Sequence, residues 1–404
     1  MDGRASLRPC ICDRECAVVM NRFTVVGQIG KGSAGSVTKA TVKKTGATVA
    51  IKHITNQRFT SFSAALAQRE VRALSRIRHP NVLRLLEVVR ENEMLYLILE
   101  YAEASLYQWM RAAKAPLGEP MVRVLAHRLL LATNHVHKCG FVHRDVKPMN
   151  ILVSHFDGDP SLLKLKLADF GAARELPRTA PGTARHEPLT PYVSTRWYRA
   201  PEVLLHASGY AAAVDMWAVG VIIAEAYRLQ PLFPGNTTID QLDRIAGVLG
   251  RPTEGALGGA QAWPYGCELV RRHEQIHSHR FPRCEPIPIA QIVPHANADG
   301  LDLIASLLRW DPAQRLTARE ALRHPFVSSK LMSSLRLVSL RCRTALLRWS
   351  LRSRSRTTRI PTATGEPPKH GTSPSPPAAL SRAQGEAPGD VRADTPSKSV
   401  PAAR

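Results

Sequence analysis

The first part of the chain alternates apolar and polar residues in short runs. Residues 1–20 are mixed in character and are expected to form a flexible leader. Runs rich in β-branched and aromatic residues follow, separated by Gly or Asn/Glu turns, and predict an antiparallel sheet over residues 23–30, 36–42, 48–54 and 94–101. One helical pattern, residues 64–77, interrupts these strands. The pattern therefore predicts a small β-rich lobe over residues 21–101.

After Ala102 the apolar residues are spaced as in helices. Residues 120–140 place Val122, Leu125, Leu129 and Val136 on one face, with Gly140 suited to end the helix. Three further helical patterns cover residues 213–229, 238–250 and 298–310. The chain is thus predicted to be an α+β protein of two lobes, the second being larger, helical and bounded by residues 102–327.

The composition changes sharply after Val327. Residues 328–359 mix arginines with apolar residues such as Leu335 and Trp349, as a basic amphipathic helix does. Such a segment could bind an anionic membrane, a calmodulin-like protein, an importin or nucleic acid, or it could pack on the helical lobe. Residues 360–404 are dominated by Pro, Ser, Ala and Gly, cannot bury enough apolar surface, and are expected to be a disordered tail.

Length, charge and cysteine content narrow the class of protein. A chain of 404 residues can hold two or three core-bearing units, and its formal net charge of +22 favours acidic partners. Seven cysteines without a regular framework suggest a reducing compartment, although Cys10, Cys12 and Cys16 could hold a metal if a fourth ligand came from elsewhere. We see no secretory signal or membrane-spanning run, so we expect a cytoplasmic or nuclear protein.

The first candidate for chemistry is a glycine-rich turn between two predicted strands. Gly30, Gly32 and Gly35 stand in a G-x-G-x-x-G-x-V frame that ends at Val37. Glycine permits close approach of the backbone to phosphates, but the frame alone also fits an ordinary hairpin turn. Because a strand follows the glycines here, rather than a helix, the order excludes a dinucleotide-binding fold. It is compatible with a lid over a nucleotide, with Val37 against the base.

A lysine closes the apolar run Val49–Lys52. A lysine that binds phosphates needs a carboxylate to position its ammonium, and Glu70 in the helical pattern is the natural candidate. Taken alone, each residue could equally be an ordinary surface charge.

The third group lies in the sequence FVHRDVKPMN. Asp145 can accept a hydroxyl proton, Lys147 can neutralise a transferring phosphoryl group, and Asn150 can bind Mg²⁺. Asp169, in LADFG, adds a hard oxygen ligand for Mg²⁺. These residue types at this spacing, in this order, indicate phosphoryl transfer.

The ordered set of glycine loop, VAIK, HRD-x-K-x-x-N, DFG and APE resembles the eukaryotic protein kinases over residues 23–327. The stretches TRWYRAPEVLL and LFPG are similar to the group of cyclin-dependent and mitogen-activated kinases. Within that group VVRENEMLYLILEY, SLYQWM and LRWDPAQRLTAREALRHPF most resemble the RCK family of male-germ-cell-associated and intestinal-cell kinases.

The resemblance implies a bilobal protein kinase fold, ATP and Mg²⁺ as cofactors, and protein substrates phosphorylated on serine or threonine before proline. It also implies Leu99 as the gatekeeper behind the adenine, a structural Asp215, and an ion pair between Arg315 and Glu202. The implied nucleotide site comprises Ile29, Gly30, Lys31, Gly32, Ser33, Gly35, Val37, Ala50, Lys52, Leu99, Glu100, Tyr101 and Leu152. We expect a monomer, and the family suggests a cilium or flagellum as a further location.

Thr190-Pro191-Tyr192 occupies the position of the family's Thr-x-Tyr activation motif. The resemblance places three arginines around a phosphate on Thr190, namely Arg69, Arg144 and Arg174, and two near Tyr192, namely Arg196 and Arg199. Relatives mostly carry an acidic residue between the two hydroxyls. Pro191 makes Thr190 itself a Thr-Pro site, so an upstream proline-directed kinase is an expected partner.

Two other classes of function compete with the enzyme. A pseudokinase would act as a scaffold through its surfaces and basic tail, but every catalytic residue that it should have lost is intact. A nucleic-acid-binding protein would use the arginines, yet no aromatic-studded sheet or groove-reading motif accompanies them.

Overall fold

The computed structural model describes residues 10–11, 19–32, 35–154, 159–176, 196–207, 212–253 and 262–328. Ser33, Thr190 and Tyr192 lie outside these residues, as do Cys12 and Cys16. The basic segment and the disordered tail expected after Val327 also lie outside them, apart from Ser328.

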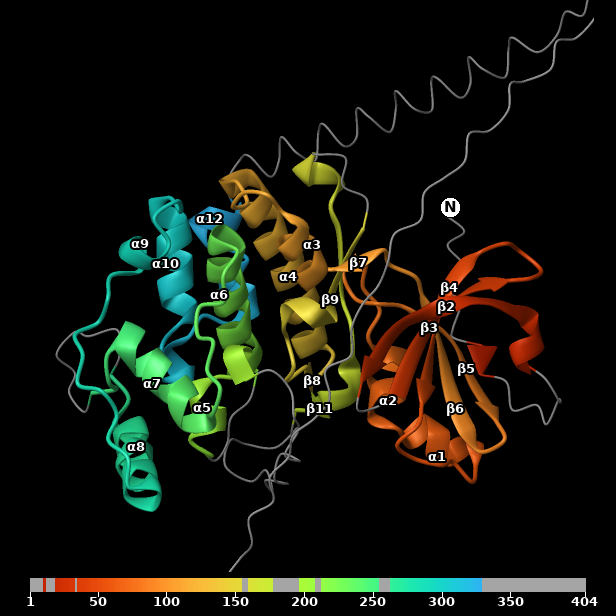
Figure 1. The fold of residues 1–404 in the computed structure, drawn as a ribbon, viewed down its shortest axis with the longest axis horizontal. Coiled ribbons are helices and arrows are strands. Elements are labelled where there is room, and N and C mark those ends of the chain that lie inside the picture. The colour runs from red at the N-terminus through yellow and green to blue at the C-terminus, as the bar shows by residue number, and fades with distance from the viewer. Residues whose placement is uncertain are drawn as a thin grey trace, which may run out of the picture. The chain divides into compact units, whose positions relative to one another are not determined.

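A six-stranded sheet forms the N-terminal lobe, drawn in red and orange in Figure 1. Its strand order is β1-β5-β6-β4-β3-β2, and every neighbouring pair is antiparallel except β1 with β5. The predicted antiparallel sheet is therefore confirmed for the four expected strands. The strands are β1 (Cys10–Ile11), β2 (Phe23–Gly32), β3 (Gly35–Val42), β4 (Thr48–Ile54), β5 (Leu85–Glu91) and β6 (Met94–Glu100).

Two strands of this sheet, β1 and β5, were not expected from the sequence. Cys10–Ile11, within the segment predicted as a flexible leader, pairs in parallel with Glu87–Val88 of β5, a pairing that the sequence pattern did not predict. The backbone of an edge strand offers unpaired hydrogen-bonding groups to any nearby extended segment, whatever its sequence pattern. β5 itself carries buried Leu85, Val88 and Val89 between charged residues, and this irregular spacing hides it.

The single helix expected at residues 64–77 is two helices, α1 (Phe62–Ala67) and α2 (Arg69–Arg76). Gln68 between them has an extended ψ of 137°, and its side chain accepts a hydrogen bond from the Val71 N–H at 2.9 Å. Gln68 thus caps α2. Glutamine favours helix interiors, so the sequence pattern gave no sign of the break. The break places Glu70 in the first turn of α2.

The helical lobe is built around α4 (Glu119–Lys138) and α6 (Ala213–Arg228), which pack against each other. α6 is buried along nearly its whole length, so it carries apolar residues on all sides. The predicted helical lobe is thereby confirmed. The remaining helices are α3 (Leu106–Ala112), α5 (Pro201–Leu204), α7 (Thr238–Leu249), α8 (Pro264–His277), α9 (Ile289–Ile292), α10 (Ala298–Leu307), α11 (Ala318–Ala321) and α12 (Pro325–Ser328).

Short strands and 3-10 turns between α4 and α5 carry most of the candidate chemistry, and a further short strand, β7 (Ala104–Ser105), precedes α3. β7, β9 (Ile151–Ser154) and β10 (Lys164–Leu167) form one small sheet, and β8 (Phe141–Val142) pairs with β11 (Arg174–Glu175). The turns are η2 (Pro148–Asn150), η3 (Pro160–Leu162), η4 (Phe170–Ala172) and η5 (Arg196–Tyr198), with η1 (Val19–Arg22) and η6 (Pro312–Gln314) elsewhere. In the part of the chain that is described, no helix has the length and apolar character to cross a membrane.

Candidate active site

The glycine-rich turn joins β2 to β3, with Gly30 opposite Val37 and Gly32 opposite Gly35. Gly35 has a φ of 149°, and a Cβ at this position would lie 1.8 Å from the His53 carbonyl oxygen. Only glycine allows β3 to lie this close to β4 there. A Cβ on Gly32 would instead meet no atom within 4 Å among the described residues. The hairpin therefore requires glycine at position 35, whereas the space around Gly32 would admit a side chain.

Apolar side chains line the position expected for the adenine. Ala50 on β4 and Leu99 on β6 face each other in register and are buried, while Val37 and Leu152 pack against the same core from β3 and β9. A small, apolar surface of this kind fits a flat purine ring. Of the other expected nucleotide-site residues, Ile29, Gly30, Lys31 and Gly32 lie on β2, Glu100 ends β6, and Tyr101 directly follows it.

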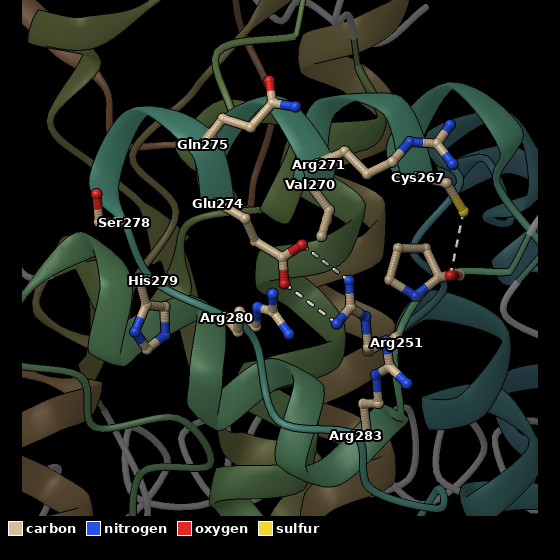
Figure 2. A pocket seen from close by; sticks show the side chains of 11 residues that line it. Arg251, Cys267, Val270, Arg271, Glu274, Gln275, Ser278, His279, Arg280 and Arg283 are labelled. Carbon is tan, nitrogen blue, oxygen red and sulfur yellow. Dashed lines mark hydrogen bonds and ion pairs between the residues drawn. The ribbon is translucent and has the colours of Figure 1, made fainter.

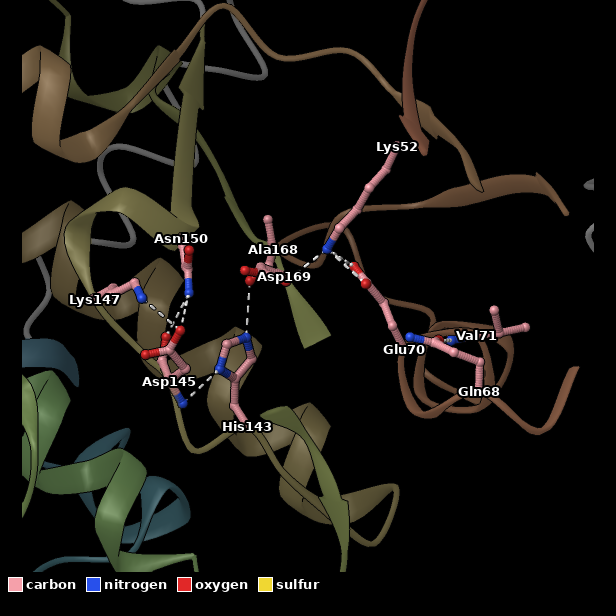
Figure 3. A network of polar contacts seen from close by, with 10 residues as sticks. All are labelled: Lys52, Gln68, Glu70, Val71, His143, Asp145, Lys147, Asn150, Ala168 and Asp169. Carbon is pink, nitrogen blue, oxygen red and sulfur yellow. Dashed lines mark hydrogen bonds and ion pairs between the residues drawn. The ribbon is translucent and has the colours of Figure 1, made fainter. Parts of the chain in front are cut away.

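Lys52 is held by two carboxylates from different parts of the chain, as Figure 3 shows. Its Nζ atom lies 2.7 Å from Oε2 of Glu70 and 2.8 Å from Oδ1 of Asp169. The expected pairing with Glu70 is confirmed, and the contact with Asp169 was not predicted. The α2 helix and the loop after β10 are therefore both joined to β4 through one ammonium group.

Burial and charge oppose each other at this site. Burial by itself would lower the pKa of Lys52, but the carboxylates of Glu70 and Asp169 outweigh it and hold that pKa above its usual value. Burial would raise the pKa of Asp169, and Lys52 reverses this effect, so the Asp169 carboxyl has a lowered pKa. The lysine is thus kept cationic, and Asp169 is kept anionic, as a cation ligand must be.

Asp145 lies at the centre of a second group (Figure 3). Its Oδ2 atom accepts hydrogen bonds from Lys147 Nζ at 2.7 Å and from Asn150 Nδ2 at 2.9 Å. Asn150 also donates to the backbone oxygen of Asp145 at 2.9 Å. These contacts fix the rotamer of the Asp145 carboxylate.

The residues around Asp145 are held by buried polar contacts. The backbone N–H groups of His143 and Arg144 donate to the Asp215 carboxylate on α6 at 2.9 and 2.8 Å, which gives Asp215 the structural role expected of it. Arg144 has a φ of 70° and Asp169 a φ of 62°, and such positive values cost free energy in non-glycine residues. The buried His143 ring meets the Ala168 carbonyl oxygen at 3.0 Å and so joins the two loops.

The residues expected to hold Mg²⁺ present suitable oxygen atoms. Asn150 uses its Nδ2 group to bond Asp145, so its Oδ1 atom is on the opposite side of the amide, as Figure 3 shows. Asp169 bonds Lys52 through Oδ1, which leaves Oδ2 as a second carboxylate oxygen. Hard oxygen donors of this kind suit Mg²⁺, so the donor set fits the ion.

The arginines expected to bind phosphate are distributed over several elements. Arg69 begins α2, Arg144 follows His143, and Arg174 lies in β11 directly opposite Val142 of β8. The strand pairing therefore brings the segments of Arg144 and Arg174 together. Arg196 donates to the Asn236 backbone oxygen at 3.3 Å, and Arg199 follows η5.

One contact between α2 and the segment after Asp169 was missed by the sequence analysis. Arg72 Nη2 and Arg76 Nη1 lie 2.5 and 2.9 Å from Oε1 of Glu175. The two arginines are one helical turn apart, which could have indicated a shared partner. The partner itself is remote in sequence and could not have been identified.

Two buried carboxylates support the segment that follows η5. Glu202 accepts from both terminal nitrogens of Arg315, one of them at 2.6 Å, so the expected ion pair is confirmed. Glu225 on α6 accepts from the Tyr198 hydroxyl at 2.7 Å, a contact that was not predicted. Burial raises the pKa of Glu225 to about 7 even though the hydrogen bond from Tyr198 acts in the opposite direction.

The raised pKa of Glu225 predicts a pH dependence of stability. Between about pH 4.5 and 7 the folded protein holds a proton that the unfolded chain has lost, so the free energy of unfolding should fall as pH rises through this window. Glu225→Gln keeps an acceptor for the Tyr198 hydroxyl but cannot titrate. The decrease in the free energy of unfolding between low and high pH should therefore be smaller in this variant, by up to about 3 kcal/mol. Urea unfolding at pH 5 and pH 8 would measure it. Glu268→Gln, at an exposed position of α8, is the control, and an unchanged slope in Glu225→Gln would contradict the prediction.

The fold and the site together define a class of protein. A model of the protein kinase domain matches residues 23–327, and the chain belongs to that family. It is 42% identical over 307 residues to the human serine/threonine-protein kinase MAK, 40% to the rat serine/threonine-protein kinase ICK and 41% to the rice cyclin-dependent kinase F-4. These similarities confirm the resemblance to the RCK family. Each covers 76% of this chain, but only 45% of MAK and of ICK and 61% of the rice protein, so the chain spans about half the length of these relatives.

Proposed function

We propose that the protein is a serine/threonine protein kinase that transfers the γ-phosphoryl group of Mg-ATP to protein hydroxyls. Two clusters of polar side chains carry the proposal. The first cluster consists of Lys52, Glu70 and Asp169. The second cluster consists of Asp145, Lys147 and Asn150. The first has the charges needed to position a nucleotide, and the second has a carboxylate and an ammonium suited to a reacting hydroxyl.

Each residue has a separate task in this proposal. Lys52, oriented by Glu70, binds nucleotide phosphates, and Asn150 and Asp169 hold Mg²⁺ through oxygen atoms. Bound Mg-ATP supplies the phosphoryl group and the cationic charge that offsets its oxygens. Asp145 orients the substrate hydroxyl and receives its proton, and Lys147 neutralises charge that develops beside Asp145.

The first experiment measures transfer of the γ-phosphate from Mg-ATP to a generic basic protein by the purified chain. Asp169→Ala is the inactive comparison, because it removes the proposed metal ligand. Transfer that is lost in this variant supports the proposal. Absence of transfer by the natural chain, even after phosphorylation of Thr190, would favour a pseudokinase scaffold instead.

We further propose that the enzyme is proline-directed and is switched by phosphorylation of Thr190 and Tyr192. The support is the family resemblance, together with the pairing of β8 and β11 that brings the segments of Arg144 and Arg174 together. A phosphate on Thr190 would add charge that these arginines can pair with. The proposed partners are therefore protein substrates and an upstream kinase, and the proposed locations are cytoplasm, nucleus or cilium.

Peptides and mass spectrometry would test this finer proposal. A Ser-Pro peptide should be phosphorylated with a higher kcat/KM than its Ser-Ala twin, and Thr190→Ala should lower activity where Thr190 is phosphorylated in the natural chain. Equal rates for the two peptides would refute proline direction while leaving kinase activity intact.

The contact of Arg72 and Arg76 with Glu175 predicts an effect on catalysis. Because α2 carries Glu70, loss of this contact should loosen the helix and raise the KM for ATP. Glu175→Gln should lower kcat/KM for ATP about two- to tenfold, since each exposed ion pair contributes at most about 1 kcal/mol. Added salt should shrink the difference by screening. Glu93→Gln, which removes an exposed pair with Arg58 in the same lobe, is the control, and an equal effect in both variants would contradict the prediction.

A further inference from the structure

A cavity of about 800 Å³ lies beside α8, in a part of the helical lobe that contributes none of the proposed catalytic residues. Its lining contains four arginines but only one acidic residue, Glu274. The lining residues are Arg251, Pro252, Cys267, Val270, Arg271, Glu274, Gln275, Ser278, His279, Arg280 and Arg283. The cavity is therefore strongly cationic and large enough for more than a small ion.

The single carboxylate of the cavity is already engaged. Glu274 Oε2 accepts from Arg251 Nη2 at 3.2 Å, and Oε1 lies 3.1 Å from Arg251 Nη1 and accepts from the Phe281 N–H at 2.8 Å. Figure 2 shows both carboxylate oxygens of Glu274 directed at Arg251. Glu274 thus neutralises Arg251 and is not bonded to Arg280 or Arg283.

Arg280 and Arg283 flank a residue that is firmly anchored. Phe281 is buried, its N–H bonds Glu274, and its carbonyl oxygen accepts from Arg251 Nη1 at 3.3 Å. Arg280 and Arg283 themselves are exposed, and among the described residues no hydrogen bond or ion pair holds either side chain. Figure 2 places both on the side of α8 toward which Glu274 points. Two cations are therefore presented from a fixed loop without a compensating anion.

We propose that this cavity binds a phosphorylated segment of a partner protein, with Arg280 and Arg283 contacting the phosphate. A phosphate monoester is a dianion that pairs with two guanidinium groups through charge-assisted hydrogen bonds. Val270 and Pro252 in the same lining offer apolar contact to a neighbouring peptide side chain. A recess with cations and apolar groups fits a peptide better than a flat membrane surface. The site is independent of the phosphotransfer proposed above.

Binding by the full chain would test the proposal. The probe is a fluorescent peptide with one phosphoserine among alanines and valines, compared by anisotropy with its unphosphorylated twin. The natural chain should bind the phosphopeptide about tenfold more tightly than the twin, and inorganic phosphate should compete. The double variant Arg280→Ala/Arg283→Ala should lose about tenfold in affinity for the phosphopeptide, as expected from losing charge-assisted hydrogen bonds.

Arg272→Ala is the matched control, because Arg272 is an exposed arginine of α8 that does not line the cavity. It should change affinity less than twofold. The proposal is overturned if the double variant binds like the natural chain, if Arg272→Ala weakens binding equally, or if the twin peptide binds as well. It is also overturned if binding to phosphoinositide vesicles requires Arg280 and Arg283 while binding to the phosphopeptide does not.

Two further measurements keep the result interpretable. Thermal unfolding should show an unchanged midpoint for the double variant, since Arg280 and Arg283 are exposed. If that variant is destabilised, Arg283→Gln alone should still weaken phosphopeptide binding several-fold, and unchanged binding would refute the proposal. Phosphopeptide binding should also persist in Asp169→Ala, which separates this site from kinase activity.

Discussion

Asp145→Asn is expected to lower kcat for phosphotransfer by about 10²- to 10⁴-fold, the range typical for loss of a positioned general base. An amide of the same shape can still accept from Lys147 or Asn150, so the loop should keep its conformation. The amide cannot take up the proton of the substrate hydroxyl at neutral pH. The KM for ATP should change little, because Lys52 contacts Glu70 and Asp169 rather than Asp145. Steady-state kinetics with Mg-ATP and a peptide substrate would measure both constants.

Asp302→Asn is the control for this prediction. Asp302 lies on α10, and its mostly exposed carboxylate pairs with His324. Replacing it removes the same charge without touching the candidate site, and kcat should stay within about twofold. Asp145→Asn activity above a tenth of the natural value would remove Asp145 from the proposed role of base.

Arg315→Ala is expected to lower the free energy of unfolding by about 3–5 kcal/mol, because it leaves the Glu202 carboxylate buried without its cation. Both side chains are fully buried. Arg315 also donates to the backbone oxygens of Arg309 and Trp310 at 2.7 and 3.0 Å, so its removal frees these acceptors as well. Urea unfolding of the full chain would measure the loss.

Two comparisons make the result specific to the buried pair. Arg244→Ala removes an exposed pair with Asp240 and should cost less than about 1 kcal/mol. The double variant Arg315→Met/Glu202→Leu replaces both charges by apolar groups and should recover part of the loss. A cost for Arg315→Ala no larger than that for Arg244→Ala would show that the buried pair contributes little.

Most residues of the candidate site could be predicted from the sequence, because only a few residue types can perform phosphoryl transfer. Asp145, Lys147 and Asn150 lie within six positions, so their proximity in space follows from their proximity in sequence. The helical lobe was similarly readable from the spacing of its apolar residues, as α4 shows. The break at Gln68 was not readable, because it is marked by a side chain that caps the start of α2 and not by a poor helix former.

By itself the sequence determined the family, the two lobes and the set of chemically competent residues, since these depend on local residue types, periodicity and order. Only the tertiary structure decided which charges meet. Lys52 pairs with Asp169, 117 positions away, and Glu175 pairs with arginines about 100 positions away. The cavity beside α8 brings Arg251 together with Arg280 and Arg283, which flank a Phe281 held by Arg251 and Glu274. Such contacts depend on the path of the backbone through space, and no short-range pattern in the sequence encodes that path.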